Sequence, residues 1–306
     1  MLQLTWGIFP VIIDNSSQLG LLKRLRKEVH SKMLSHHARR SWEELQYPFS
    51  SIKSASDGEL YAATLGRGVF RRSREGEWLP WSTGMPDSMA VNRLQPGAGA
   101  MYACTDQGLY RLQTDEWEAT EVAIPCYQYR EQGGFRLAGT QYGLWGFDSA
   151  SSEWLQLSMR DAIVYDVLVT PHYLILGTEN GIALYDQYMS EWSEHPIGAA
   201  VTGLAVVGGR IVGVTERGSL AIGNQRGGFE TYRLGNTFHY GLSVCDGGVY
   251  VCADRGLYRL GVSRGQILLV SVRLGTPVTD VELSGGQMHL ATLYEGIQSV
   301  ERPAFQ

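Results

Sequence analysis

The chain has 306 residues, of which 44% are hydrophobic and 19% charged, and its formal net charge is −5. This composition is typical of a folded globular protein, and no apolar run reaches the length of about 18 residues that crosses a bilayer. The apolar N-terminus lacks the basic start and the cleavage site of a signal peptide, so we expect a cytoplasmic protein without a transmembrane segment. The acidic balance argues against nucleic acid as a partner.

The first expected elements are a strand and a helix. Residues 1–9 contain the β-rich run LQLTWGIF. Apolar residues at helical spacing then predict an amphipathic helix within residues 16–45: Leu22, Leu25, Val29 and Met33. Seven basic residues and one acid give the stretch from Lys23 to Arg40 a charge of +6. Such a helix either packs on its own acidic protein or binds an anionic partner or membrane surface.

From about residue 49 onward one sequence motif recurs, in which a β-rich run is followed by a glycine that begins a second β-rich run. The seven glycines stand 35 to 40 residues apart: Gly68, Gly108, Gly143, Gly181, Gly218, Gly256 and Gly296. A unit of that length holds about four short strands and no helix, which is typical of a propeller blade. We therefore predict an all-β, seven-bladed β-propeller as a single domain over residues 1–306, assumed monomeric. The expected blades are approximately 49–82, 89–122, 124–158, 162–196, 200–234, 238–273 and 277–301.

The seventh unit ends without an outer strand. Residues 1–9 precede the first blade and carry Trp6 where an outer strand would have its aromatic residue. We expect them to supply the fourth strand of the last blade, because this arrangement closes the ring and removes two exposed sheet edges. Deleting residues 1–9 should then destabilise the whole ring.

Propeller topology predicts where residues 16–45 would lie. The link between two blades leaves on the same face as the turn between the second and third strands, and the inner strands begin on that face. The predicted helix would therefore cap this mouth of the central channel as a lid, a wall or a plug.

Polar residues near the starts of the inner strands are the candidate site. Aligned on their apolar positions, these strands place six residues in a first row: Asn92, Tyr127, Tyr165, Thr202, Tyr240 and Thr279, with Ser50 expected to join them. A second row holds Arg93, Gln128, Asp166 and Asp280, and His239 precedes Tyr240. Tyr165, Asp166, His239 and Tyr240 are candidate acid–base catalysts, and the others are candidate ligand contacts, with Arg93 suited to a carboxylate or phosphate. The alternative is that these residues only fill the channel, as every propeller must.

Cofactor and metal signals are absent from the sequence. We find no nucleotide-binding loop, dinucleotide fingerprint or nucleophile elbow, so kinase, dehydrogenase and serine hydrolase activities are not expected. The four cysteines lack metal-ligand spacing and are expected to be buried free thiols. We therefore expect no cofactor and no metal.

Individual units resemble known repeats. The stretch LYAATLGRGVFRRSREGEWLPWSTGMP is similar to the repeats of Asp-box propellers, with Ser73, Gly76 and Trp78 in place and Glu75 where the aspartate would stand. RLAGTQYGLWGFDSASSEW and LILGTENGIALYDQYMSEW resemble the repeats of two-component regulator propellers. The resemblance implies the propeller fold and specifies little function. The Phe-Arg-Ile-Pro segment and arginine triad of Asp-box sialidases are not present, so sialidase activity is not implied.

Three functions remain open. The first is a small-organic-molecule site at the channel mouth under residues 16–45, with cofactor-independent acid–base catalysis such as cyclisation, elimination or bond formation as one form of it. The second is a protein-interaction or scaffold propeller without catalysis. The third is a binder of an anionic partner or membrane surface through the basic helix.

Overall fold

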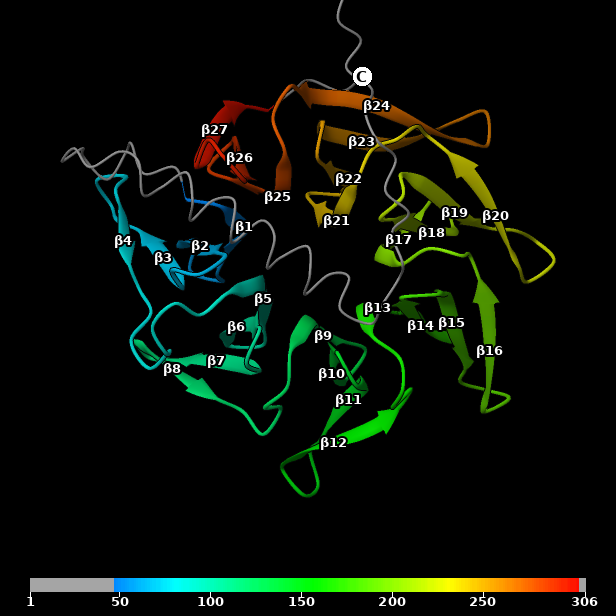
Figure 1. Ribbon diagram of the computed structural model, residues 1–306, viewed down its shortest axis with the longest axis horizontal. Coiled ribbons are helices and arrows are strands. Elements are labelled where there is room, and N and C mark those ends of the chain that lie inside the picture. Colours follow the sequence, from blue (N-terminus) through cyan, green and yellow to red (C-terminus); the bar gives the residue numbers. More distant parts are fainter. Residues whose placement is uncertain (1–46, 303–306) are drawn as a thin grey trace, which may run out of the picture. The chain divides into compact units, whose positions relative to one another are not determined.

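The computed structural model describes residues 47–302. Its regular structure there consists of 27 β-strands and no helix, and the strands form seven antiparallel sheets. Figure 1 shows these sheets arranged as blades around a common axis. The fold is therefore an all-β, seven-bladed propeller, as the repeat predicts.

Each of the first four blades has four strands in sequential order from the axis outward. Blade 1 consists of β1 (Phe49–Ser54), β2 (Leu60–Thr64), β3 (Val69–Arg72) and β4 (Trp78–Pro80). Blade 2 consists of β5 (Val91–Gly97), β6 (Ala100–Thr105), β7 (Leu109–Gln113) and β8 (Glu116–Ala119). Blade 3 consists of β9 (Cys126–Gln132), β10 (Phe135–Thr140), β11 (Gly143–Asp148) and β12 (Glu153–Ser158). Blade 4 consists of β13 (Val164–Val169), β14 (Tyr173–Thr178), β15 (Gly181–Asp186) and β16 (Glu191–Pro196).

The remaining blades follow the same order. Blade 5 consists of β17 (Val201–Val207), β18 (Arg210–Thr215), β19 (Ser219–Gly223) and β20 (Phe229–Arg233). Blade 6 consists of β21 (His239–Cys245), β22 (Gly248–Ala253), β23 (Gly256–Ser263) and β24 (Gln266–Leu274). Blade 7 has three strands among the described residues, β25 (Val278–Ser284), β26 (Gln287–Thr292) and β27 (Ile297–Glu301).

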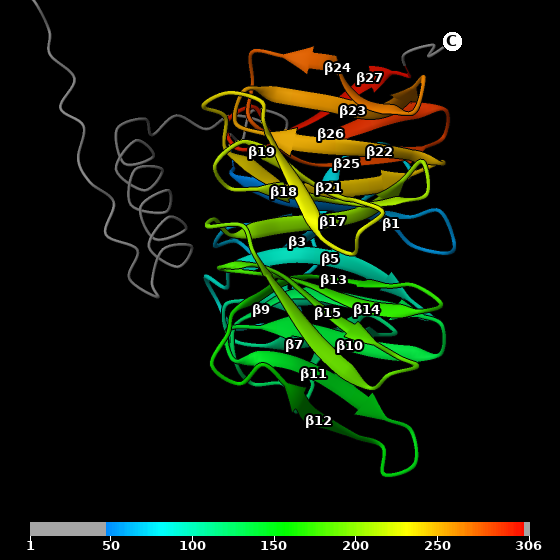
Figure 2. The same ribbon diagram turned by 90° about the vertical axis from the view of Figure 1, so that its right-hand side faces the viewer.

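The ring has two faces, and the strands run between them (Figure 2). We call the face that carries the hairpins between first and second strands the hairpin face. The opposite face, with the turns between second and third strands and the links between blades, is the turn face. Inner strands begin at the turn face and end at the hairpin face.

The recurring Thr-x-x-Gly motif forms the turns between second and third strands on the turn face. The Thr105 hydroxyl donates to the carbonyl of Gly108 at 2.8 Å and accepts from its N–H at 3.0 Å, and Thr140 donates to Gly143 in the same way. Gly108 has φ +147°, and a Cβ there would lie 2.4 Å from the carbonyl oxygen of Val122. Glycine recurs at this position because the turn packs against the backbone that follows the blade's own outer strand.

The core lies between adjacent blades. Between blades 1 and 2, buried Tyr61 and Val69 pack with Leu94, Met101 and Trp117. Trp117 lies on an outer strand, is 1% exposed, and donates from Nε1 to the carbonyl of Trp81 at 2.8 Å. Each blade thus buries its two faces against its neighbours, which gives the ring its stability.

Blades 7 and 1 are joined at their inner strands. Thr279 on β25 donates to the carbonyl of Phe49 at 2.8 Å, and Asp280 accepts hydrogen bonds from Ser51 and from the N–H of Ile52. The predicted outer strand over residues 1–9 and the predicted helix within 16–45 lie outside the described residues. Over residues 47–302, no helix is present that could span a membrane.

Candidate functional site

A β-bulge near the start of each inner strand shapes the centre of the ring. In all seven blades the register shifts at this point, and the extra residue is a member of the first row. A bulged residue is left out of the ladder and its side chain is redirected. In four of the blades this side chain reaches the next blade around the ring.

Four first-row residues use this position to join neighbouring blades. Their side chains donate to the backbone carbonyl of the residue that begins the next inner strand: Ser50 to Val91 at 2.5 Å, Asn92 to Cys126 at 2.7 Å, Thr202 to His239 at 3.0 Å and Thr279 to Phe49 at 2.8 Å. Asn92, Thr202 and Thr279, which we predicted to contact a ligand, therefore already serve as links between blades.

Tyrosines occupy the other three first-row positions. Tyr127 and Tyr165 pack edge to face with ring centroids 5.2 Å apart, and both are buried. The hydroxyl of Tyr165 has no hydrogen-bond partner within the described part of the chain. Burial raises the pKa of Tyr127 to about 12 and the pKa values of Tyr165 and Tyr240 further above the ordinary value. All three phenols are therefore protonated at neutral pH.

The second row contains two buried carboxylates that bridge blades. Asp166 accepts from Gln128 Nε2 at 2.6 Å, from its neighbour Val167 N at 2.8 Å and from Leu204 N of the next blade at 2.7 Å, with Arg130 Nη2 at 3.4 Å. Since four donors occupy a fully buried carboxylate, Asp166 has little capacity left to act as a base.

Asp280 is the equivalent residue of blade 7. Its Oδ2 accepts from the Ser51 hydroxyl at 2.6 Å and from Ile52 N at 3.1 Å, while its Oδ1 accepts from Lys53 Nζ at 2.8 Å and from Ser243 Oγ. Burial alone would raise the pKa of Asp280, but the positive charges of Lys53 and Arg93 and the hydrogen bonds outweigh it and hold the pKa below the ordinary value. Burial alone would lower the pKa of Lys53, but Asp280 and Glu282 raise it. The two groups form a buried ion pair at neutral pH.

Two glycines of the second row, Gly203 and Gly241, leave space for different neighbours. A Cβ at Gly241 would lie 2.5 Å from Nη2 of Arg93, so the guanidinium reaches across the axis from blade 2 to blade 6. A Cβ at Gly203 would instead lie 2.4 Å from the backbone nitrogen of Leu242. Gly241 makes room for a side chain, and Gly203 makes room for the neighbouring strand.

Beyond Arg93, toward the hairpin face, lies a pocket of about 380 Å³, here called the channel pocket. Its lining comes from the second halves of five inner strands and their hairpins: Lys53, Ser54, Arg93, Gln95, Pro96, Tyr129, Arg130, Glu131, Gln132, Leu242, Ser243, Val244, Cys245, Asp246, Asp280, Glu282 and Leu283. Of the predicted site residues, only Arg93 and Asp280 belong to this lining. The pocket opens at the hairpin face, whereas we predicted the site at the turn face.

Every acid in the channel pocket has a protein partner. Glu282 accepts from Ser54 and lies 3.8 Å from Lys53, and Glu131 accepts from Ala98 N at 2.8 Å and from the Tyr129 hydroxyl at 2.9 Å. Asp246 pairs with Arg302, and Asp280 is described above.

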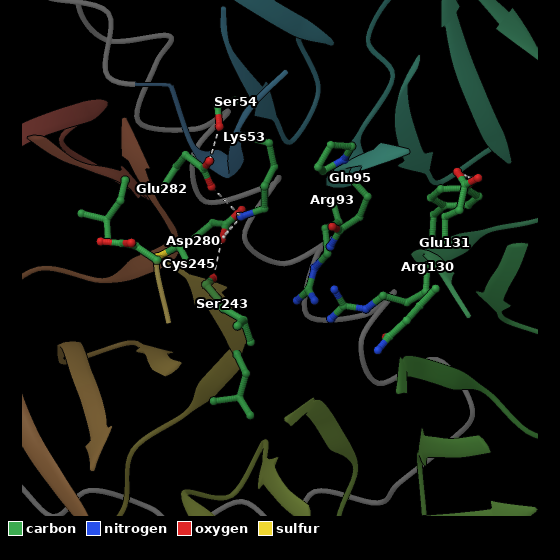
Figure 3. A pocket seen from close by; sticks show the side chains of 17 residues that line it. Lys53, Ser54, Arg93, Gln95, Arg130, Glu131, Ser243, Cys245, Asp280 and Glu282 are labelled. Atoms are coloured by element: carbon green, nitrogen blue, oxygen red, sulfur yellow. Dashed lines mark hydrogen bonds and ion pairs between the residues drawn. The ribbon is translucent and has the colours of Figure 1, made fainter. Parts of the chain in front are cut away.

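The cations are less fully paired. Figure 3 shows the guanidinium groups of Arg93 and Arg130 pointing toward one another, whereas Lys53, Asp280 and Glu282 gather on the other side of the pocket. Arg130 donates from Nε to the carbonyl of Val167 at 3.1 Å and contacts Asp166 only at 3.4 Å. Among the described residues the Arg93 guanidinium has neither a hydrogen bond nor an ion pair within 4.0 Å. Two permanently charged groups thus face each other, and none of the acidic side chains labelled in Figure 3 lies between them.

The four predicted acid–base residues do not form one constellation. Tyr165, Asp166 and His239 are buried at 3%, 0% and 1% exposure, and Tyr240 is partly exposed. Burial lowers the pKa of His239 to about 4, so its imidazole is neutral at neutral pH. Among the described residues no hydrogen bond or ring contact joins the pair in blade 4 to the pair in blade 6. Their catalytic role stays a prediction.

The sequence analysis missed most of the pocket lining. Lys53, Gln95, Arg130, Ser243 and Glu282 hold the same position in five inner strands, two residues after the second row. The signal was the recurrence of polar or charged residues at one position of five inner strands, and the alignment that produced the two rows would have revealed this third row.

Comparisons with known proteins show the fold alone. No family model and no curated protein matches the chain. Among solved structures, the extracellular domain of BT4673 from B. thetaiotaomicron, named as part of a one component system, has a TM-score of 0.69 at 17% identity, covering 85% of this chain and 39% of that one. The chain thus spans about two fifths of the length of that neighbour. Virginiamycin B lyase from Staphylococcus aureus has a TM-score of 0.67 at 11% identity, covering 85% and 97%. The WD40 propeller domain of Doa1 has a TM-score of 0.64 at 13% identity, covering 83% and 92%.

Proposed function

We propose that this propeller is a recognition module that binds an anionic group in the channel pocket without transforming it. The observation that carries the proposal is the facing pair of guanidinium groups of Arg93 and Arg130, of which Arg93 makes no ion pair within 4.0 Å among the described residues. Bringing two cations together costs free energy, and an anion between them removes that cost. Arginine donates two parallel hydrogen bonds to a carboxylate, which adds geometric selectivity.

The charge balance of the lining favours a singly charged anion. Among the described residues three cations and four acids line the pocket, and one of these acids, Asp246, is paired with Arg302 outside the lining, so the lining is close to electrically neutral. A dianion loses more hydration energy on entering such a pocket than a monoanion does, and the pocket has no excess positive charge to compensate for it. A carboxylate therefore fits the pocket better than a phosphate.

The same geometry supports binding rather than catalysis. The acids of the pocket are engaged by Lys53, Arg302, serine hydroxyls and backbone N–H groups, and no histidine within residues 47–302 lines it. A general acid or base needs a titratable group within reach of the substrate and free to exchange a proton. The neighbours described as an extracellular domain of a one component system and as a WD40 propeller domain are compatible with a binding role, although their low identity carries only the fold. The cytoplasmic location stays a prediction.

Titration with acetate tests the proposal. Thermal unfolding of the full chain, in a buffer of bulky weakly coordinating anions at constant ionic strength, should shift upward with acetate, because a ligand at 100 times its dissociation constant stabilises the native state by about 2.7 kcal/mol. Arg93→Gln should abolish the shift. Arg160→Gln, the same charge change at an exposed residue of the turn face, should retain it. Equal shifts in the two variants, or no shift in the wild type, would refute the proposal.

A further inference from the structure

The hairpin face carries exposed apolar side chains beside the channel pocket. Val244 lines the pocket and is 58% exposed. Val206 on blade 5 and Val262 on blade 6 are 46% and 49% exposed. A Cβ at Gly208 would lie 2.7 Å from Val262, so the hairpins of blades 5 and 6 touch each other. These valines lie at the ends of strands β17, β21 and β23, which all point to the hairpin face.

Blades 3 and 4 also carry exposed aromatic residues at the hairpin face. Phe135 and Tyr173 begin the second strands of these blades and are 48% and 38% exposed. Tyr188 and Met189 lie in the hairpin between β15 and β16 and are 74% and 68% exposed. The ring of Tyr188 packs against His172 at 5.3 Å, so the side chain is held at the surface rather than folded into the core.

Aromatic residues, methionine and arginine are enriched in protein interfaces, and arginine is common among the hot-spot residues near an interface centre, where the surrounding contacts exclude water. A free small carboxylate between Arg93 and Arg130 would leave these side chains in water. A carboxylate carried by a polypeptide brings neighbouring residues onto them.

We propose that the natural occupant of the channel pocket is an aspartate or glutamate side chain of a protein partner, flanked by apolar residues that cover the hairpin face near Val206, Val244 and Val262. This inference rests on the proposed function, because it names the source of the anion. The central carboxylate provides the charge complementarity, and the flanking residues provide apolar area that a free acid lacks. Added salt should therefore weaken the electrostatic contribution of the central carboxylate but not the contribution of the apolar contacts.

Selection from a phage-displayed random peptide library on the immobilised full chain tests the inference. We expect enriched peptides to share one acidic residue with apolar neighbours. Replacing that residue by its amide should weaken binding by about 10- to 100-fold, the usual effect of losing hydrogen bonds to a charged group. Arg93→Gln and Arg130→Gln should each weaken binding by a factor in the same range. Arg93→Lys should cause a smaller loss, because the ammonium keeps the positive charge but cannot donate two parallel hydrogen bonds to one carboxylate.

Val262→Ser isolates the apolar contribution. The side chain is half exposed and outside the pocket, so the variant should fold as the wild type does and should bind the peptide several-fold more weakly with acetate binding unchanged. Arg160→Gln should bind the peptide as the wild type does.

The outcomes separate the two proposals. If acetate binds through Arg93 but no acidic peptide is enriched, or if enriched peptides bind Arg93→Gln equally well, the inference is wrong and the proposed function stands. If acetate fails to bind the wild type, the proposed function fails as well.

Discussion

Asp280→Asn is the substitution most informative about how the ring is held at its centre. The carboxylate accepts hydrogen bonds from Ser51 and Ile52 of blade 1, from Ser243 of blade 6 and from Lys53, whose side chain is 12% exposed. Asparagine offers one acceptor oxygen and an NH₂ group that must face donors. The substitution therefore leaves donors unpaired and removes the nearest counter-ion of a buried ammonium.

We expect Asp280→Asn to lower the free energy of unfolding by about 3–5 kcal/mol, the usual cost of removing one partner of a buried ion pair. Asp166→Asn is the matched control, because Arg130, its charged partner, is 25% exposed and 3.4 Å away. Asp166→Asn should lower the free energy of unfolding by about 1.5–3 kcal/mol, because it mainly loses hydrogen bonds to a charged acceptor. Adding Lys53→Met to Asp280→Asn should recover part of the loss, because it removes the buried ammonium that has lost its nearest counter-ion and keeps only Glu282 at 3.8 Å.

Urea unfolding followed by tryptophan fluorescence measures these differences. The pH dependence gives a second readout. Since the pKa of Asp280 is below its ordinary value, the stability it contributes is fully present above about pH 3.9 and is lost as pH falls through the lower folded-state pKa. Asp280→Asn should lack that acid-side loss. An unfolding free energy within about 1 kcal/mol of the wild type, or a second substitution at Lys53 that only adds damage, would refute this account.

Further predictions concern single residues of the central rows. Gly203→Ala should destabilise the fold by about 1–3 kcal/mol in a urea melt because its Cβ meets the backbone, whereas Gly241→Ala should cost less stability but weaken acetate binding by displacing Arg93. Equal melts for the two variants would contradict this reading. Tyr165→Phe should leave the thermal midpoint unchanged or slightly higher, since its hydroxyl is buried without a partner in the described residues; a large loss would mean that a partner exists. His239→Gln should remove a loss of stability on the order of 3 kcal/mol that the wild type shows as pH falls from about 6.5 toward about 4, because only the unfolded state binds the proton there.

The propeller could be predicted from sequence because its determinants are local. Glycine is required at positions 108 and 143 because a Cβ there would lie 2.4 and 2.3 Å from a backbone carbonyl oxygen. Threonine recurs at positions 105 and 140 because its hydroxyl donates a hydrogen bond across the same turn. Such constraints repeat in every blade and leave a period that one sequence reveals.

The candidate site could be predicted only in part. Polar residues at the starts of inner strands were recognised, but sequence does not show that a bulge turns Asn92 and Thr202 toward the next blade, where their side chains bond backbone. The sequence also does not show that Asp166 and Asp280 each accept hydrogen bonds from two other blades. These are non-local contacts whose partners lie more than 30 residues away.

Arg93 illustrates the same limit. Its candidacy as a carboxylate ligand followed from its chemistry, but its reach to Gly241 and its approach to Arg130 depend on how three blades converge. The sequence position of Arg93 in its strand also did not show that its side chain lines the pocket at the hairpin face.

A crystal structure of the full chain grown with acetate tests the central claim most directly. The account predicts planar density for one carboxylate between the guanidinium groups of Arg93 and Arg130, with two donors of at least one arginine within about 3 Å of its oxygens. A structure in which both guanidinium groups instead pair with acids of the lining, such as Glu131 and Glu282, and acetate is absent from the pocket would contradict it.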